Sequence, residues 1–524
     1  IRCSFVIHAH TIIGIILHLR ATITLSRNLF LREMSNIIKI DSESRTRDIK
    51  TIVDEICKNY HIELLLLLPS RYRKTIRDAL SSQSSSSSSS WRVRAYRYFL
   101  ENVEPYQLST IDYDHPICDL QSIKISLSKY KRGDLIDVPS ELQLKGDLAY
   151  IKSGIDRFVM SNGSVDKKKK EFYGQVTNLL DQFASYRKRL KAMLKMPYLT
   201  NAYLKCWEMI HDYKLIPRDH PSTYRVFCNA EFPGAFIFAI NQYMSTSTDN
   251  PSFEWFGNSL WPGSDAKGEI LSDEFGLYKR HANKWLMDGK TYDGDVTSLR
   301  TIDHIYEKIG ESADLYTSDI GIPLDVSNFN DQEEVETPLN LGQIICGLVS
   351  LKRGGHLICK MFMFFTPFNI SMLWMLTEMF EEFYLSKPVT SRPGNSEIYI
   401  IGKGYRGYQT CREKIDKLKE ALSTSSYGEQ LCKVPEEFYL RIVNASYEIY
   451  QRQMRYVDMS VKVADYLYRN KMPVRYNEAR DDRRVMPNTS VSLRDEIKHR
   501  EEIVNEWKET YKEHLLAKKL HLFL

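Results

Sequence analysis

The stretch "GGHLICKMFMFF" (354–365) is a mostly apolar run that contains a single lysine, Lys360. Short continuous apolar runs introduced by glycine are typical of strands buried on both faces of a parallel sheet. A lysine at such a position either extends its amine to water from the strand end or has a chemical role. On its own the first interpretation is favoured, so the segments around the strand decide the matter.

Short apolar segments and helix-length segments alternate on both sides of this strand, from about residue 201 to residue 404. Further strands are predicted at "YRVFCNA" (224–230), "ADLYTSD" (313–319) and "SEIYIIGKGY" (396–405). Helices are predicted at 237–244, 339–355 and 372–383. This alternation predicts an α/β fold with a mostly parallel sheet, and we expect 396–405 to be an antiparallel edge strand.

Length and composition indicate a folded protein of several domains. The chain has 524 residues, 43% hydrophobic residues and a formal net charge of +5, which does not by itself indicate a polyanionic partner. The chain begins with Ile1 and Met34 opens a polar stretch, so residues 1–33 are expected to lie upstream of the working protein. We predict an N-terminal appendage (1–80), a serine-rich linker (81–90), a mostly helical accessory region (91–194), the α/β domain (195–405) and a helical C-terminal region (406–524).

Cysteine spacing and the N-terminal apolar run bear on metal and membrane binding. The nine cysteines are scattered singly, without a CxxC pair or a Cys/His spacing that would close a zinc site. This pattern indicates reduced thiols and no metal. The run "FVIHAHTIIGIILHL" (5–19) is interrupted by histidines and ended by Arg20, so a membrane span is not expected.

Three polar residues are predicted to meet at one edge of the sheet. In open α/β sheets, ligands bind outside the carboxyl ends of the parallel strands. Asp319 ends one strand, Lys360 lies late in its own strand, and Glu397 begins the strand expected to be antiparallel. Each has a simpler interpretation, with Asp319 as a helix N-cap and Glu397 as a turn cap or the partner of Arg392. Only their predicted convergence favours a catalytic site.

A tight turn, "EFPGAF" (231–236), follows the strand at 224–230. A glycine in such a turn lets backbone N–H groups approach a ligand closely, which suits a nucleotide or a nucleoside. The turn does not match GxGxxG, so alone it is a weak indication. The mismatch argues against a nicotinamide-dependent dehydrogenase, which needs that fingerprint.

Five segments carry the residues of a known family. They are "EFPGAFIFAINQYM", "YDGDVTSL", "LYTSDIGI", "LKRGGHLICKMF" and "KPVTSRPGNSEIYIIGKGY", of which "SRPGNSEIY" is the most specific. In order and approximate spacing they resemble the FtsJ-like (RrmJ-type) 2′-O-ribose methyltransferases, closest to the cap-specific messenger RNA enzymes of eukaryotes and large DNA viruses. The resemblance covers roughly residues 195–405. It implies a Rossmann-like methyltransferase fold with S-adenosylmethionine (SAM) bound across the first strand and its turn.

The resemblance also implies a Lys-Asp-Lys-Glu tetrad that acts on a ribose hydroxyl. Its four positions fall on Lys205, Asp319, Lys360 and Glu397, the first of them in "NAYLKCWEMI" (201–210). Alone, Lys205 would be an exposed helical lysine paired with Glu208. Lys360 is expected to accept the hydroxyl proton or to position the hydroxyl. A free lysine has a pKa of about 10.4, so this role requires burial and a second cation, which Lys205 would provide.

For the cofactor, the resemblance places one group of residues against the methionine part of SAM: Glu231, Pro233, Gly234, Ala235 and Phe236. Asp295, in "GDVTS", matches the family position near the adenine. Three residues around the turn depart from the small residues usual in the family: Asn229, Ala230 and Phe232. These departures leave the affinity for SAM open.

The RNA substrate is predicted to be capped messenger RNA, because the chain has flanking regions on both sides of the family core, as the cap enzymes do. Aromatic and basic residues are interleaved at 253–290, which suits stacking on unpaired bases beside neutralised phosphates. A loop that packs its tryptophans on the core is an equally good interpretation. Capping or transcription proteins are expected partners, without a membrane. The expected location is cytoplasmic or nuclear or, for a viral protein, the host cytoplasm or the virion.

Two other functions stay open at this point. A methyltransferase-like module without activity would bind RNA or a capping partner through its helical flanks, although all four residue types of the tetrad are present. A ribosomal RNA 2′-O-methyltransferase would use the same site on a different RNA.

Overall fold

The computed structural model of the chain describes residues 122–128, 135–138, 142, 144–158, 160–161, 164–220, 222–250, 252–261, 273–321, 332–471, 473–474 and 493–518. All of them belong to one compact unit, residues 112–524. The predicted appendage and serine-rich linker lie outside the described residues, and the predicted domain boundaries stay predictions. Within the described ranges, none of the helices is both long and apolar enough to cross a membrane.

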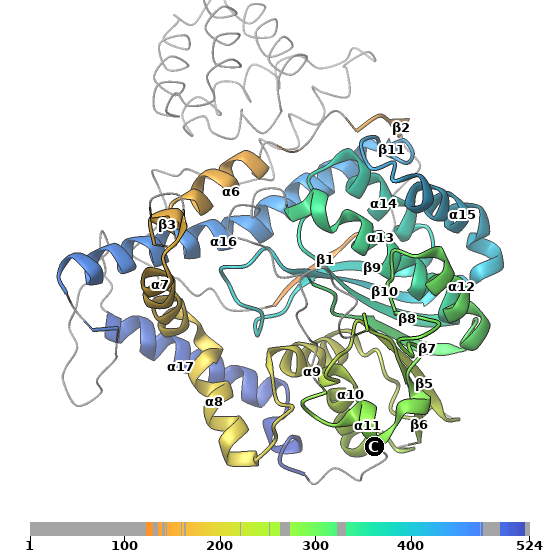
Figure 1. Cartoon of the computed structure of the whole chain (residues 1–524), viewed down its shortest axis with the longest axis horizontal. Helices are drawn as coiled ribbons and strands as arrows, with labels where there is room; N and C mark the ends of the chain where they lie inside the picture. Colours follow the sequence, from red (N-terminus) through yellow and green to blue (C-terminus); the bar gives the residue numbers. More distant parts are fainter. Residues whose placement is uncertain are drawn as a thin grey trace, which may run out of the picture. The chain divides into compact units, whose positions relative to one another are not determined.

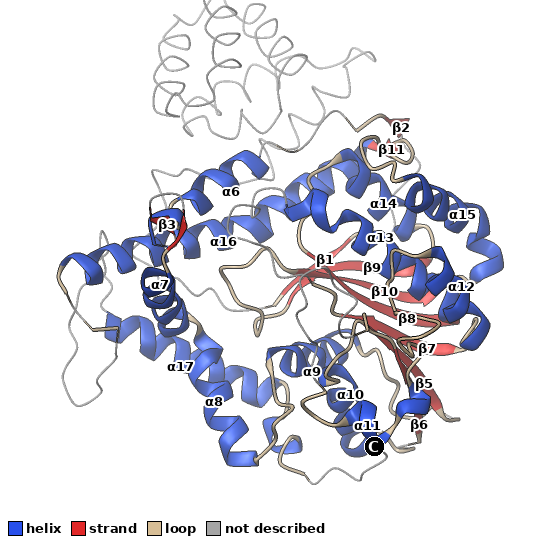
Figure 2. Cartoon of the chain, in the orientation of Figure 1, coloured by secondary structure: helices blue, strands red, loops and turns tan. Residues whose placement is uncertain are grey.

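A mixed sheet of seven strands forms the centre of this unit (Figure 1, Figure 2). The strands are β1 (Ile123–Ser126), β5 (Tyr224–Asn229), β6 (Phe253–Gly257), β7 (Ala313–Ser318), β8 (Leu351–Met361), β9 (Phe380–Lys387) and β10 (Ile398–Tyr405). Their order across the sheet is β1-β9-β10-β8-β7-β5-β6. The strands β5, β6, β7, β8 and β9 point one way, whereas β10 and β1 run antiparallel to their neighbours.

Helices cover both faces of the sheet (Figure 1). On one side lie α9 (Asn201–Tyr213) and α10 (Ala235–Ser247), and on the other α12 (Leu299–Lys308), α13 (Gln332–Ser350) and α15 (Tyr408–Thr424). The flanking helices are α6 (Leu144–Ser153), α7 (Lys167–Leu180) and α8 (Gln182–Leu194) before the α/β domain, and α16 (Glu436–Arg469) and α17 (Leu493–Thr510) after it. A core of buried apolar residues joins α8, α9, α10 and α17 to the sheet.

Side-chain caps explain where three of these helices begin. Asp166, Asp181 and Thr200 each accept a hydrogen bond from a backbone N–H of the following first turn, at α7, α8 and α9 respectively. Because Asp181 ends one helix and starts the next, the segment 167–194 forms two helices and not one. In the C-terminal region, α16 is one continuous helix, and α17 ends at Thr510 and is followed by a 3-10 turn at 513–515.

The predicted fold class is confirmed, but the place of one strand is wrong. The antiparallel strand 396–405 lies inside the sheet as β10, and the antiparallel edge strand is β1. The error comes from the segment 372–383, which we predicted as one helix. There, α14 (Pro367–Thr377) ends early and β9 begins at Phe380 and pairs with β10. Phe380 and Phe383 are three residues apart, a spacing that also fits a helix.

The segment 339–355 is also wrong as a single helix. The helix α13 ends at Ser350, and residues 351–355 open β8. Gly354 has φ = 83° within this strand. Lys352 and Arg353, near the start of β8, are exposed. The continuous apolar pattern therefore starts only at Gly355, and the sequence does not show how early the strand begins.

Candidate active site

The four predicted tetrad residues converge at the carboxyl edge of the sheet. Asp319 directly follows β7, Lys360 is the penultimate residue of β8, and Glu397 directly precedes β10. The start of β10 lies at this edge because the strand is antiparallel to β8, with Ile398 opposite Met361. Lys205 reaches the same point from α9 on one face of the sheet.

Lys205 is buried between two carboxylates. Its Nζ lies 3.0 Å from Oε2 of Glu397 and 3.6 Å from Oδ1 of Asp319, and only 5% of the residue is exposed. The alternative of an exposed lysine paired with Glu208 is therefore wrong. Burial alone would lower the pKa of Lys205, but the charges of Asp319 and Glu397 and their hydrogen bonds raise it.

The amine of Lys360 lies inside the tetrad. Its Nζ lies 3.3 Å from Oδ1 of Asp319 and donates a 2.9 Å hydrogen bond to the Asp319 carbonyl. The residue is 8% exposed, so the amine faces the cluster and does not extend to water. The two lysines share Oδ1 of Asp319, which also accepts a 2.6 Å bond from the hydroxyl of Tyr399. The second cation expected near Lys360 is thus present.

Glu397 is held by Lys205 and by Ser391, whose Oγ donates a 2.7 Å bond to Oε1. Arg392, the alternative partner, is exposed to solvent. Burial alone would raise the pKa of Glu397, but the charges of Lys205, Lys360 and Lys387 lower it to about 2. The carboxylate is therefore ionised at neutral pH.

Three ionisable groups near the tetrad were missed by sequence reasoning. Lys387 donates to the carbonyls of Asn395 and Glu397 at 2.8 and 2.6 Å, and burial with the charges of neighbouring lysines lowers its pKa to about 7 despite Glu397. Burial lowers the pKa of Lys152 to about 8. Burial also raises the pKa of Glu336 to about 7. Lys387 belongs to a segment that resembles the family, 387–405, whereas no neighbouring sequence pattern places Lys152 or Glu336 near the tetrad.

Glu336 predicts a pH dependence of stability that can be measured. Its pKa in the folded chain, about 7, lies above its ordinary value of 4.5. The folded state therefore retains this proton longer than the unfolded state, and stability is lost as pH rises from the lower pKa through the upper one. Glu336→Gln cannot ionise, so we expect its melting temperature relative to wild type to be higher at about pH 8 than at about pH 5. Thermal unfolding followed by circular dichroism would check this, and an equal difference at both pH values would contradict it.

The turn after β5 fits the methionine part of SAM. Gly234 has φ = 111° and directly precedes α10, so backbone N–H groups face the carboxyl edge. Oε1 of Glu231 accepts the N–H of Phe236 at 2.7 Å, whereas its buried Oε2 has no partner. Burial raises the pKa of Glu231 well above its usual value although these N–H groups lower it. A ligand ammonium group would supply the charge and the donor that this carboxyl lacks.

Hydrogen bonds connect the Asp295 turn to the end of β5, at the same edge of the sheet. Asn258 donates to Oδ1 of Asn229 at 2.9 Å and to the carbonyl of Gly294 at 3.1 Å. Asp295 accepts the backbone N–H and the hydroxyl of Thr297 at 2.9 and 2.8 Å. Asn229, one of the family departures, is therefore a structural link that ties the Asp295 turn to the end of β5.

Gly234 predicts a specific loss of cofactor binding. A Cβ at this position would lie 2.6 Å from Cδ2 of Leu277, and its positive φ is strained for other residues. We expect Gly234→Ala to raise the Kd for SAM about tenfold or more, a change that corresponds to roughly 1.4 kcal/mol. Gly174→Ala, on α7 with open space around it, is the matched control and should leave Kd unchanged. Isothermal titration of both variants would check this, and an unchanged Kd for Gly234→Ala would contradict it.

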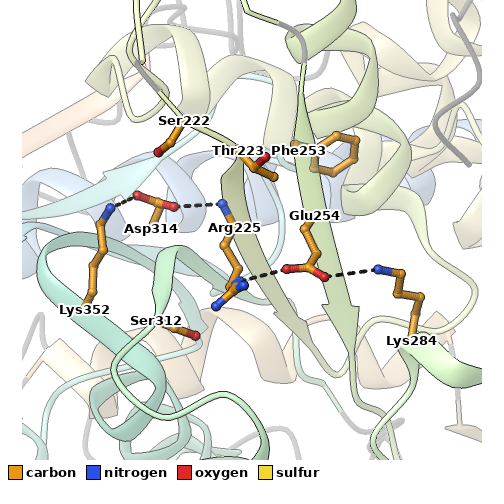
Figure 3. A pocket seen from close by; sticks show the side chains of 9 residues that line it. All are labelled: Ser222, Thr223, Arg225, Phe253, Glu254, Lys284, Ser312, Asp314 and Lys352. Carbon is orange, nitrogen blue, oxygen red and sulfur yellow. Dashed lines mark hydrogen bonds and ion pairs between the residues drawn. The ribbon is translucent and has the colours of Figure 1, made fainter.

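A separate polar pocket of about 470 Å³ lies at the opposite edge of the sheet (Figure 3). It is lined from the amino ends of the strands by Arg225, Glu254, Asp314 and Lys352 together with Lys284. Glu254 pairs with Arg225 at 2.9 Å and with Lys284 at 3.5 Å, and Lys352 pairs with Asp314. Three cations and two carboxylates line this pocket, and each of them takes part in an ion pair, so it is a network of ion pairs away from the tetrad.

The aromatic insert is packed on the core where the structure describes it. Trp255 and Trp285 are buried, and Phe232 stacks on Trp285 with ring centroids 4.7 Å apart. Lys279 and Arg280 are exposed. For the described part of 253–290, the interpretation as a packed loop fits the tryptophans better than base stacking does; residues 262–272 lie outside the described residues.

The chain is similar in sequence to known methyltransferases. Residues 198–405 match the family model of the FtsJ-like methyltransferases. The chain is 33% identical over 331 residues to a "Probable methyltransferase" of African swine fever virus, covering 61% of this chain and 72% of that protein. It is 28% identical over 257 residues to the cap-specific mRNA (nucleoside-2′-O-)-methyltransferase 2 of Drosophila melanogaster, covering 47% of this chain and 36% of that protein.

A crystal structure assigned as a ribosomal RNA methyltransferase of Plasmodium falciparum is 18% identical, with a TM-score of 0.25 over 40% of this chain and 98% of that one. The chain belongs to the FtsJ-like methyltransferase family. It is a methyltransferase that acts on RNA and uses SAM as its cofactor.

Proposed function

We propose that the enzyme transfers a methyl group from SAM to a ribose 2′-OH of RNA, at a cap-proximal nucleotide of messenger RNA. The observation that carries the proposal is the buried cluster in which Lys205 and Lys360 share Oδ1 of Asp319 and Lys205 also binds Glu397. This cluster lies at the carboxyl edge of the sheet, where α/β folds bind their ligands.

Each residue of the tetrad has a role in the proposed methyl transfer. Transfer to a 2′-OH would be an in-line displacement: the hydroxyl oxygen bonds to the methyl carbon as the methyl–sulfur bond breaks, the sulfonium leaves as a neutral thioether, and the hydroxyl proton passes to a base. Lys360 positions the hydroxyl or accepts its proton. Asp319 orients both amines, since each lysine contacts Oδ1. Glu397 fixes Lys205 and balances its charge.

The turn and the Asp295 segment would hold the cofactor. Glu231, through its unpartnered Oε2, would bind the ammonium group of the methionine part beside the Gly234 turn. Asp295 would lie near the adenine. When bound, SAM supplies the methyl group on a sulfonium that needs no further activation.

Two reasons support capped messenger RNA as the substrate over ribosomal RNA. The cap-specific relative shares the family core, and the present chain has helical regions on both sides of its own core. Other capping or transcription proteins are proposed partners. The proposed location is the cytoplasm or nucleus or, for a viral protein, the host cytoplasm or the virion.

The test uses the purified full chain, methyl-labelled SAM, two short RNAs that differ only in the presence of a cap, and a ribosomal RNA. Nuclease digestion and mass spectrometry would locate the methyl group. Label on a cap-proximal 2′-oxygen supports the proposal. Label on uncapped ribosomal RNA instead would assign a ribosomal substrate. SAM binding without transfer to any RNA would favour the inactive, RNA-binding module.

A further inference from the structure

The segment that delivers Glu397 is an irregular loop between β9 and β10, residues 388–397, which we name the Glu397 loop. Within the family core, Lys387 fixes its end by donating to the carbonyls of Asn395 and Glu397. The rest of the loop pairs with no strand that the structure describes. It has two backbone turns of its own, in which Ser391 donates to the Pro388 carbonyl and Asn395 to the Arg392 carbonyl, and side chains from other elements hold it from outside.

Two side chains hold the start of the loop. Glu208, on the same helix as Lys205, accepts the N–H of Val389 at 2.7 Å and the hydroxyl of Thr390 at 2.8 Å. Trp507 of α17 donates its indole N–H to the same carboxylate at 3.3 Å. Gln182 of α8 donates to the Val389 carbonyl at 3.0 Å. Two flanking helices therefore contact the loop start, one directly and one through Glu208.

Two further side chains hold the end of the loop, next to Glu397 itself. Oγ of Ser396 accepts bonds from Lys152 of α6 at 2.8 Å and from Gln453 of α16 at 3.0 Å. Gln453 also donates to the Gly394 carbonyl at 3.1 Å. Gln453 and Ser396 are 2% and 3% exposed, so water cannot readily replace these bonds.

Each of these flanking residues lies outside 198–405, the residues that match the family. We propose that the helical regions before and after the family core position Glu397, and that Gln453 is a positioning residue for methyl transfer. The inference rests on the proposed function, in which Glu397 fixes Lys205. It gives the C-terminal region a role in the reaction: the family core is a complete catalytic unit only when α6, α8, α16 and α17 hold the loop.

Gln453→Leu tests the proposal in the full chain, because leucine keeps the volume and removes both hydrogen bonds. We expect kcat to fall about tenfold through misplacement of Glu397, with KM for SAM changed less than about twofold. Ser460→Ala is the matched control, since Ser460 is buried on the same helix and bonds only to the Tyr456 carbonyl of that helix. Its kcat should equal that of wild type.

Two readouts separate positioning from a general loss of stability. In the Glu397→Gln background, Gln453→Leu should lower kcat no further, because residues that act through one group are non-additive. Hydrogen exchange of the peptide spanning 388–397 should speed up in Gln453→Leu and not in Ser460→Ala.

The outcomes distinguish this inference from the proposed function. Additive effects on kcat in both backgrounds, or unchanged exchange in the loop, would overturn the positioning role. If the wild type transfers no methyl group to capped RNA, the proposed substrate is wrong. Faster hydrogen exchange of the loop in Gln453→Leu, and not in Ser460→Ala, would still show that Gln453 holds the Glu397 loop in place.

Discussion

Lys360→Met is expected to lower kcat for methyl transfer by roughly 10³-fold, within the range attributed to general acid–base groups. Methionine keeps the length of the side chain and removes the amine that contacts Oδ1 and the carbonyl of Asp319. The turn at Gly234 follows another strand, β5, so the Kd for SAM should change less than about twofold. Single-turnover transfer to capped RNA and titration with SAM would measure the two effects.

Lys352→Met is the matched control for this experiment. Lys352 stands on the same strand, β8, but at the amino edge, where it pairs with Asp314. Its kcat should stay within about twofold of wild type, because Lys352 lies at the edge of the sheet opposite the tetrad. Its folding should also be little affected, because surface ion pairs contribute little to stability. If Lys360→Met kept most of its activity, the amine would not act on the hydroxyl, and the tetrad would have a structural role only.

The strand-end rule explains why much of the site could be predicted from the sequence. Asp319 directly follows β7, and Lys360 lies near the end of β8, its parallel neighbour, so their positions along the chain were enough to bring them together. Glu397 was placed correctly only because β10 is antiparallel to β8; its neighbour β9 was taken for part of a helix, and the error did not move the start of β10. The family resemblance added Lys205, which no strand rule could place.

The surroundings of the tetrad could not be predicted, because they come from segments far apart in the sequence. Ser396 meets Lys152 and Gln453 across 244 and 57 residues respectively. Glu208 was considered only as the i,i+3 partner of Lys205, yet its carboxylate binds the loop and Trp507. Local spacing shows which side chains share a helix face, whereas their partners are set by tertiary packing.

Lys205→Met is expected to reduce both activity and stability, because it leaves the carboxylates of Asp319 and Glu397 without their shared cation. Breaking a buried ion pair from one side costs about 3–5 kcal/mol, and we expect a loss of this order in urea unfolding near neutral pH. We expect kcat to fall at least about 100-fold, since Glu397 and Asp319 would no longer be held together. Lys205→Arg is the control: it keeps the charge but not the compact ammonium, so it should recover stability more than activity.

The pH dependence of this loss identifies its cause. In wild type the pKa of Glu397 is lowered from 4.5 to about 2, so its contribution to stability is present above the upper value and lost as pH falls towards the lower one. Without Lys205, the pKa of Glu397 is expected to rise. As pH falls, protonation of Glu397 then removes the cost of an unpaired buried charge in the variant, whereas wild type loses the stabilisation that its ionised Glu397 provides. The difference in unfolding free energy between wild type and Lys205→Met should therefore shrink from about pH 7 to about pH 4. A difference that stayed constant over this range would mean that lost packing, and not the unpaired carboxylates, destabilises the variant.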